Sequence, residues 1–163
     1  MNDSLVIFNQ IRNRKDFREG IMDFEDALSK VPTAKVGHDA DEEMFPLKHS
    51  FGDGCYIREI FMPKGMLLTS KIHKVEHPYF VMKGKCSVLT EDGVVEIQAP
   101  FQGMTKPGTK RLILVHEDCT WITVHVTKHQ EIEKIEKEII AESFDEIDKL
   151  EYKNMKVIKE ATL

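Results

Sequence analysis

The sequence has little cysteine and no long apolar run. Its three cysteines are widely spaced along 163 residues, which is typical of reduced thiols rather than of a disulfide-stabilised scaffold. No stretch approaches the roughly 20 apolar residues that cross a bilayer. The first residues also lack a basic segment followed by an apolar one, so we expect no secretory signal. We therefore expect a cytoplasmic protein without a membrane partner.

An excess of positive charge is also missing. The formal net charge is −5, whereas domains that bind nucleic-acid polymers present a broadly basic surface. We therefore expect no nucleic-acid polymer as a partner. The composition is 41% hydrophobic and 31% charged, as in ordinary globular proteins, and the length fits one domain.

Two segments of the sequence show helical periodicity. Residues 15–31 place apolar side chains at helical spacing before Pro32, which predicts an amphipathic helix. Residues 131–143 predict a second helix, whose isoleucine stripe we expect to pack against the rest of the domain or a second subunit. The SFDE sequence at 143–146 is typical of a capping box and predicts a further short helix. Residues 32–53, with two prolines and an acidic run, predict a loop.

The middle of the chain shows strand periodicity instead. Short runs rich in β-branched and aromatic residues alternate with turn sequences such as Asp92-Gly93, about every ten residues. This pattern predicts an all-β sandwich or barrel. The expected organisation is a single domain with an N-terminal helical and loop extension (1–53), a β-barrel (54–127) and a C-terminal helical extension (128–163). The runs read CYIREIFM, MLLTSKIH, YFVMKGK, CSVLTEDG, VVEIQAP, RLILVH and WITVHVT.

The stretch SKIHKVEHPYF, residues 70–80, contains an H-x-x-E-H string. On a helix this spacing would suit a zinc peptidase, with Glu76 activating water. Pro78 argues against that, because it disfavours helical backbone in His77 and cannot continue a helix. Two strands joined by a tight turn at residues 74–76 are expected instead, with Glu76 facing solvent. Such a turn brings His73 and His77 together.

Residues 54–127 resemble the cupin superfamily of small β-barrels. In the first cupin motif, Gly65 opens the stretch and Gly84 closes it. Counting back from Gly84 places His77 at the glutamate position and His73 at the second histidine position. Lys71 stands where the first histidine is expected. The resemblance implies a cupin-like, jelly-roll β-barrel with helical extensions at both ends.

The second cupin motif is present in altered form. Pro107-Gly108 fits its turn, but Arg111 occupies the histidine position and Val115 the asparagine position. The wider pattern also resembles uncharacterised cupin-like proteins of tailed bacteriophages, an origin that would place the protein in the host cytoplasm. Cupins hold a metal with three histidines and a glutamate. Because cationic lysine and arginine are poor metal ligands, the substitutions favour an anion over a metal.

If the inward pattern of a barrel is retained, one pocket receives basic, imidazole and aromatic groups. Such a pocket favours a phosphate or carboxylate attached to a flat group. The function we expect is binding of a small anionic, phosphate-bearing and nucleotide-like ligand, with sequestration of a signalling nucleotide as a possible purpose. The predicted ligand-binding residues are Lys71, His73, His77, Tyr79, Arg111, Trp121, Thr123 and His125.

Three alternatives use the same region. A metal-independent phosphodiesterase or hydrolase would use His73 and His77 as catalytic base and acid. A metal-dependent cupin enzyme would hold zinc or iron through His73, His77 and His125; no cofactor is otherwise favoured. A structural protein would use the barrel only as a scaffold. Each is compatible with a homo-oligomer, a dimer or higher.

Overall fold

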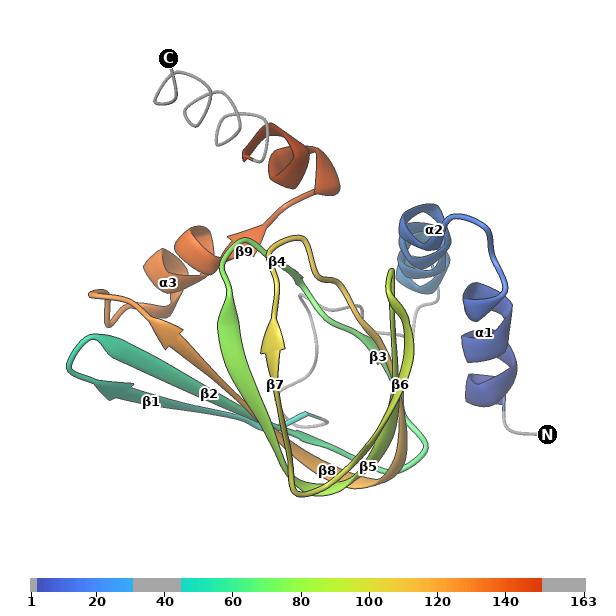
Figure 1. Ribbon diagram of the computed structural model, residues 1–163, viewed down its shortest axis with the longest axis horizontal. Coiled ribbons are helices and arrows are strands. Elements are labelled where there is room, and N and C mark those ends of the chain that lie inside the picture. The colour runs from blue at the N-terminus through green and yellow to red at the C-terminus, as the bar shows by residue number, and fades with distance from the viewer. Residues whose placement is uncertain (1–2, 31–44, 151–163) are drawn as a thin grey trace, which may run out of the picture.

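Two long antiparallel strands form the centre of the computed structural model, which describes residues 3–30 and 45–150 (Figure 1). These strands, β5 (His77–Thr90) and β8 (Leu112–Val126), pair with each other along most of their length. The main sheet has the order β1-β2-β8-β5-β6, with β3 paired to β8 and β7 paired to β5. Each long strand therefore has a different outer partner along each of its halves: β7 and then β6 for β5, and β3 and then β2 for β8.

The curvature comes from bulges where β5 crosses β8. The register between the two strands shifts between Val81 and Cys86, and bulges bend and twist a sheet. Gly84, in this region, has φ 89°, and a β-carbon added there would lie 2.3 Å from the Asp118 carbonyl oxygen. Only glycine fits that close approach. Beyond the bulge β5 exchanges its second partner, from β7 to β6.

Shorter strands complete the barrel and its edge. All pairings are antiparallel, and a separate two-stranded sheet joins β4 to β9 next to the start of β5. The short strands are β1 (Leu47–Gly52), β2 (Cys55–Met62), β3 (Leu67–Thr69), β4 (Ile72–His73), β6 (Gly93–Gln98), β7 (Phe101–Thr105) and β9 (Ile140–Ala141).

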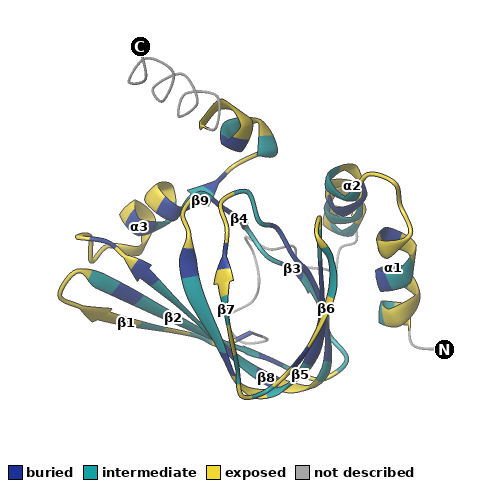
Figure 2. Cartoon of the chain, viewed as in Figure 1, coloured by how far each residue is buried: buried dark blue, intermediate teal, exposed yellow. Residues whose placement is uncertain are grey.

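Helices lie against two sides of the barrel, and their outward sides are exposed (Figure 2). Helices α1 (Asp3–Arg12) and α2 (Phe17–Ser29) cover β5, β6 and β8 through a cluster that includes Phe8, Ile21 and Leu112. Helix α3 (Ile132–Ile139) packs Ile135 and Ile139 onto Tyr56 of β2. Residues 144–150 are also helical. Among the described residues, no helix has the length and apolar character needed to cross a bilayer.

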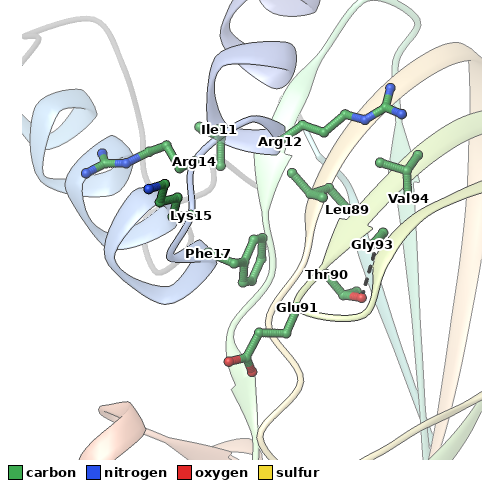
Figure 3. Close-up of a pocket in the computed structure, with 10 residues that line it drawn as sticks. All are labelled: Ile11, Arg12, Arg14, Lys15, Phe17, Leu89, Thr90, Glu91, Gly93 and Val94. Carbon is green, nitrogen blue, oxygen red and sulfur yellow. Dashed lines mark hydrogen bonds between the residues drawn. The ribbon is translucent and has the colours of Figure 1, made fainter.

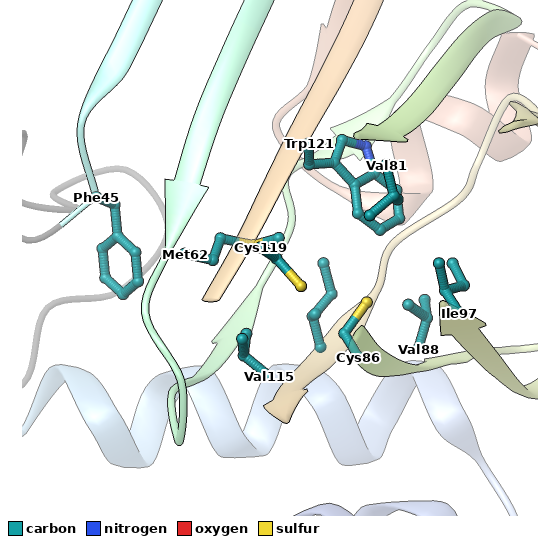
Figure 4. Close-up of a cluster of buried hydrophobic side chains, with 10 residues drawn as sticks. Phe45, Met62, Val81, Cys86, Val88, Ile97, Val115, Cys119 and Trp121 are labelled. Atoms are coloured by element: carbon teal, nitrogen blue, oxygen red, sulfur yellow. The ribbon is translucent and has the colours of Figure 1, made fainter. Parts of the chain in front are cut away.

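The main core is a cluster of apolar side chains between the strands of the barrel (Figure 4). It is built from residues of β2, β5, β6 and β8 together with Phe45, which precedes β1. All three described cysteines are free thiols. Its buried members are Phe45, Met62, Val81, Cys86, Val88, Ile97, Ile113, Val115, Cys119 and Trp121.

The predicted fold class is confirmed: a mainly β barrel has helices before it and after it, although two helices precede it instead of the one expected. The run 55–62 is strand β2 as expected, and Asp92-Gly93 forms the β5–β6 turn. Some local predictions were wrong. Lys83-Gly84 is a bulge inside one strand rather than a turn between two, and β1 occupies 47–52 of the predicted loop. The rest of that loop up to residue 44, like Val31, lies outside the described residues.

Candidate functional site

Three buried histidines from three strands form one cluster inside the barrel. His73 ends β4, His77 begins β5, and His125 lies near the end of β8. Their ring centres are 4.5 Å apart for His73 and His77, 4.2 Å for His77 and His125, and 6.2 Å for His73 and His125. The expected turn does bring His73 and His77 together, while Glu76 between them is exposed. We call these three residues the imidazole cluster.

Each ring of the imidazole cluster has a buried nitrogen without a hydrogen-bond partner. These atoms are His73 Nδ1, His77 Nε2 and His125 Nδ1. The other ring nitrogen of His77, Nδ1, lies 2.9 Å from the Val75 carbonyl oxygen, and His125 Nε2 lies 3.0 Å from Thr123 Oγ1. Buried polar atoms are normally hydrogen-bonded. Three unpaired nitrogens in one place therefore indicate a candidate ligand-binding site.

The imidazole cluster is neutral at neutral pH. Burial lowers the pKa of His73 well below 6.5, with further lowering from His77 and Arg111. Burial also lowers the pKa of His125 to about 3, and that of His77 to a smaller extent because the bond to the Val75 carbonyl opposes it. A neutral imidazole has one N–H donor and one acceptor nitrogen. The cluster is therefore a set of hydrogen-bonding groups rather than of cations.

Next to the imidazole cluster, an arginine lies over two stacked aromatic rings. The Tyr79 and Trp121 rings are 4.6 Å apart and nearly parallel, at 13°. The Arg111 guanidinium carbon lies 5.1 Å from the Tyr79 ring centre and 5.7 Å from that of Trp121. Gly103, opposite Tyr79 on β7, makes room, since a β-carbon there would lie 2.6 Å from the tyrosine ring. We call these three side chains the arginine–aromatic stack.

Arg111 is a buried cation without a carboxylate partner among the residues that the structure describes. It is 6% exposed, and its Nη2 donates to Thr105 Oγ1 at 2.6 Å. No acidic residue in the described part of the chain, Glu59 on β2 included, pairs with it. Burial lowers its pKa to about 10, which still leaves it protonated. Cation–π contact offsets part of the desolvation cost, and an anion would offset much more.

Thr105 links the two groups. It is the cross-strand partner of His77 and the acceptor of the Arg111 hydrogen bond. The Arg111 charge also lowers the pKa of both His73 and His77. The guanidinium and the imidazole cluster therefore face the same interior space.

The remaining predicted residues occupy the margin of this site. Lys71 Nζ lies 2.8 Å from Glu136 Oε1 on α3, so its charge already has a carboxylate partner. Thr123 faces inward between Trp121 and His125, in agreement with strand alternation. His49 and His116, expected to be structural or surface residues, contact Tyr56 and Ser87 instead of the imidazole cluster.

Arg58 is a site residue that the sequence interpretation missed. It lies on β2 opposite Thr123, on the same face as the buried residues Tyr56 and Met62. Its charge lowers the pKa of His73 and His125, and it forms no ion pair with any described residue. Strand alternation from Tyr56 and Met62 would have placed Arg58 inward. It adds a second positive charge to the site.

A metal centre, the alternative that the cupin resemblance implies, does not fit these residues. The orphaned nitrogens are suitable donors in kind. However, in the part of the chain that the structure describes, no group of three or more His, Cys, Asp or Glu side chains is placed to hold a metal ion. No carboxylate of the described residues pairs with the Arg111 cation, which faces the same space.

A cavity of about 350 Å³ lies away from the imidazole cluster, between the α1–α2 turn and the β5–β6 hairpin (Figure 3). Its walls are apolar side chains such as Phe17 and Leu89. The cations at its edge, Arg12, Arg14 and Lys15, are all exposed, and Arg14 pairs with Asp23 at 2.8 Å. It contains none of the predicted site residues, and its polar groups are already in solvent or paired.

No protein-family model and no curated protein matches the chain. Similar solved structures include a cupin-2 domain-containing protein from Shewanella frigidimarina (11% identity, TM-score 0.42, 50% of this chain and 79% of that chain). A putative ethanolamine utilization protein from Salmonella typhimurium gives 10% identity and a TM-score of 0.47, covering 58% and 79%. A cupin 2 domain-containing protein from Halorhodospira halophila gives 15% and 0.46, covering 56% and 69%. The similarity concerns the fold alone, and no ligand or residue role transfers with it.

Proposed function

We propose that the barrel binds a small anionic ligand between the imidazole cluster and the arginine–aromatic stack. The observation that supports this most is Arg111, a buried guanidinium whose one hydrogen-bond partner among the described residues is a neutral hydroxyl. A buried charge without a counter-charge is costly, and a guanidinium suits a phosphate or carboxylate through paired N–H donors. Arg58 supplies a second charge from the neighbouring strand.

The expected ligand carries its anionic group as phosphate next to a flat group, as a nucleotide does. Tyr79 and Trp121 present stacked rings beside the guanidinium, and aromatic faces bind planar groups. Among phosphate-bearing metabolites, this combination favours a nucleotide-like ligand, and a binding protein without turnover would act by sequestering it.

The same residues support hydrolysis less well. His77 has a free acceptor nitrogen and would serve as a base. The acid, however, must be protonated near the working pH, and the lowered pKa values of His73 and His125 keep both neutral there. Binding without turnover is the function that the electrostatics favour.

Calorimetric titration with a panel of mononucleotides, cyclic nucleotides and dinucleotides tests the proposal. We expect at least one to bind in the micromolar range, and Arg111→Met to weaken that binding by about a hundredfold, as loss of a charge-assisted pair does. Arg12→Gln removes a positive charge from the edge of the cavity between α1–α2 and the β5–β6 hairpin; it is the matched control and should change affinity less than twofold. Binding that is unaffected by Arg111→Met, or no binding below millimolar concentration, would overturn the proposal. Chromatography of the ligand after prolonged incubation separates binding from hydrolysis.

A further inference from the structure

The orphaned nitrogen of His77 is a hydrogen-bond acceptor, not a donor. Its Nδ1 lies 2.9 Å from the Val75 carbonyl oxygen. A carbonyl oxygen only accepts, so Nδ1 must hold the proton. The lowered pKa of His77, caused chiefly by burial, keeps the ring from taking a second proton at neutral pH. Nε2 therefore presents a bare lone pair, buried and without a partner in the described residues.

This lone pair faces the space that the anion would occupy. His77 is 2% exposed, and its cross-strand neighbour Thr105 accepts the Arg111 hydrogen bond. Arg111 attracts a negative oxygen, while Nε2 repels one unless that oxygen, or a neighbour on the same group, bears hydrogen. A fully ionised anion would leave the acceptor unpaired, and a buried acceptor without a donor is costly.

We propose that the site selects oxyanions that bear a proton, such as hydrogen phosphate or the monoanion of a phosphate monoester, over anions without one, such as sulfate or a phosphate diester. This inference rests on the proposed anion-binding function and narrows its ligand class. Arg111 provides the attraction common to all these anions, and His77 Nε2 accepts the hydrogen that only the first group has. Within nucleotide-like ligands, a terminal phosphate monoester is preferred to a cyclic or linear diester.

Inorganic phosphate and sulfate are the direct probes, because both are small tetrahedral oxyanions. Titration of the full chain at pH 6.5 and constant ionic strength should show phosphate binding about tenfold more tightly than sulfate, the effect of one buried hydrogen bond. In His77→Asn, an amide replaces the Nδ1 donor but nothing replaces Nε2. The preference should then fall to about twofold or less, while His77→Gln, whose amide oxygen reaches the Nε2 position, should recover part of it.

The controls distinguish the anion-binding function from the selectivity for protonated oxyanions. Arg111→Met should weaken phosphate and sulfate alike, and His116→Asn, outside the site, should leave the preference unchanged. Equal binding of both anions that depends on Arg111 would overturn the selectivity and leave the proposed function standing. Binding of neither anion, or binding independent of Arg111, would overturn both. A stoichiometric metal that elemental analysis finds in the natural protein and not in His77→Asn would also overturn the inference, since the metal would occupy Nε2.

Discussion

Lys110 and Arg111 are consecutive buried cations with opposite electrostatic surroundings. They are 5% and 6% exposed. Lys110 Nζ lies 2.7 Å from the Glu25 carboxylate and also donates to the Ser70 carbonyl oxygen. Arg111 has one neutral hydroxyl and two aromatic rings. Lys110 therefore forms an ion pair that links the barrel to α2, whereas the Arg111 guanidinium can still pair with an anionic ligand.

Replacing these two cations should therefore affect stability in opposite directions. Arg111→Met removes a buried charge without a counter-charge, so the free energy of unfolding should rise by about 1 kcal/mol. Lys110→Met leaves the Glu25 carboxylate without its partner and should lower that free energy by about 3 kcal/mol. Urea denaturation of both variants measures the difference. Equal destabilisation by the two substitutions would show that Arg111 is structural.

The imidazole cluster should make stability fall as the pH decreases below about 6.5. The unfolded histidines take up protons near their ordinary pKa of 6.5, whereas His125 in the folded chain does so only near pH 3 and His73 well below 6.5. Protonation therefore favours the unfolded state between those values, and this contribution to stability is complete only above pH 6.5.

The midpoint of urea denaturation should accordingly be lower at pH 5 than at pH 7.5. The difference between the midpoints at the two pH values should be smaller in His125→Gln. Glu131 and Glu146, whose pKa values are lowered by their bonds to lysines, lose their contribution to stability mainly below their ordinary pKa of 4.5, so the histidines account for most of the difference between pH 7.5 and pH 5. A midpoint at pH 5 equal to or above that at pH 7.5 would contradict the assigned burial of neutral rings.

Arg58 should contribute to anion binding although it makes no ion pair in the described chain. Its removal in Arg58→Gln should weaken phosphate binding by about fivefold, because a charge close to the site is lost. Lys48→Gln, on the exposed face of the adjacent strand β1, is the matched control and should have little effect. Isothermal titration distinguishes the two. Equal effects would mean that only the overall net charge matters.

Glu136 should compete with the ligand for Lys71. Its carboxylate holds the Lys71 ammonium at 2.8 Å, so Glu136→Gln should free that cation and tighten phosphate binding by about threefold. Glu133→Gln makes the same charge change at an exposed position of α3 and serves as the control. If neither variant alters the affinity, Lys71 does not contact the ligand.

Self-association is the expected oligomeric behaviour, and the outer face of β5 and β7 is where we would look for it. Met82 and Met104 on this face are 58% and 56% exposed. A glutamate at each position should shift the sedimentation coefficient of the full chain towards the monomer if this face forms the contact. A natural protein that sediments as a monomer at all concentrations would reject the expectation.

The sequence predicted the barrel because short alternating runs and turn residues report local backbone preferences directly. It predicted the meeting of His73 and His77 for the same reason, since Pro78 excludes a helix. It did not predict that β5 and β8 are continuous, because a bulge glycine such as Gly84 and a turn glycine look alike in a sequence. Strand β7 was missed because its most unusual residue, Gly103, is explained only by the Tyr79 ring on the partner strand.

The charge partners at the site were the least predictable feature. Whether a lysine or arginine is free depends on distant residues: Glu136 for Lys71, and no carboxylate in the described chain for Arg111. The Lys71–Glu136 pair links positions 65 residues apart, which local patterns do not report. Arg58, by contrast, could have been placed on the inward face from the sequence, by strand alternation with Tyr56 and Met62.

The most direct test of the account is the affinity of the natural protein and of Arg111→Met for inorganic phosphate, measured by calorimetry at pH 6.5. We predict that the natural protein binds one phosphate per chain and that Arg111→Met, folded and at least as stable, binds it about a hundredfold more weakly. Equal affinity in the two proteins would contradict the claim that the buried guanidinium is the anion site.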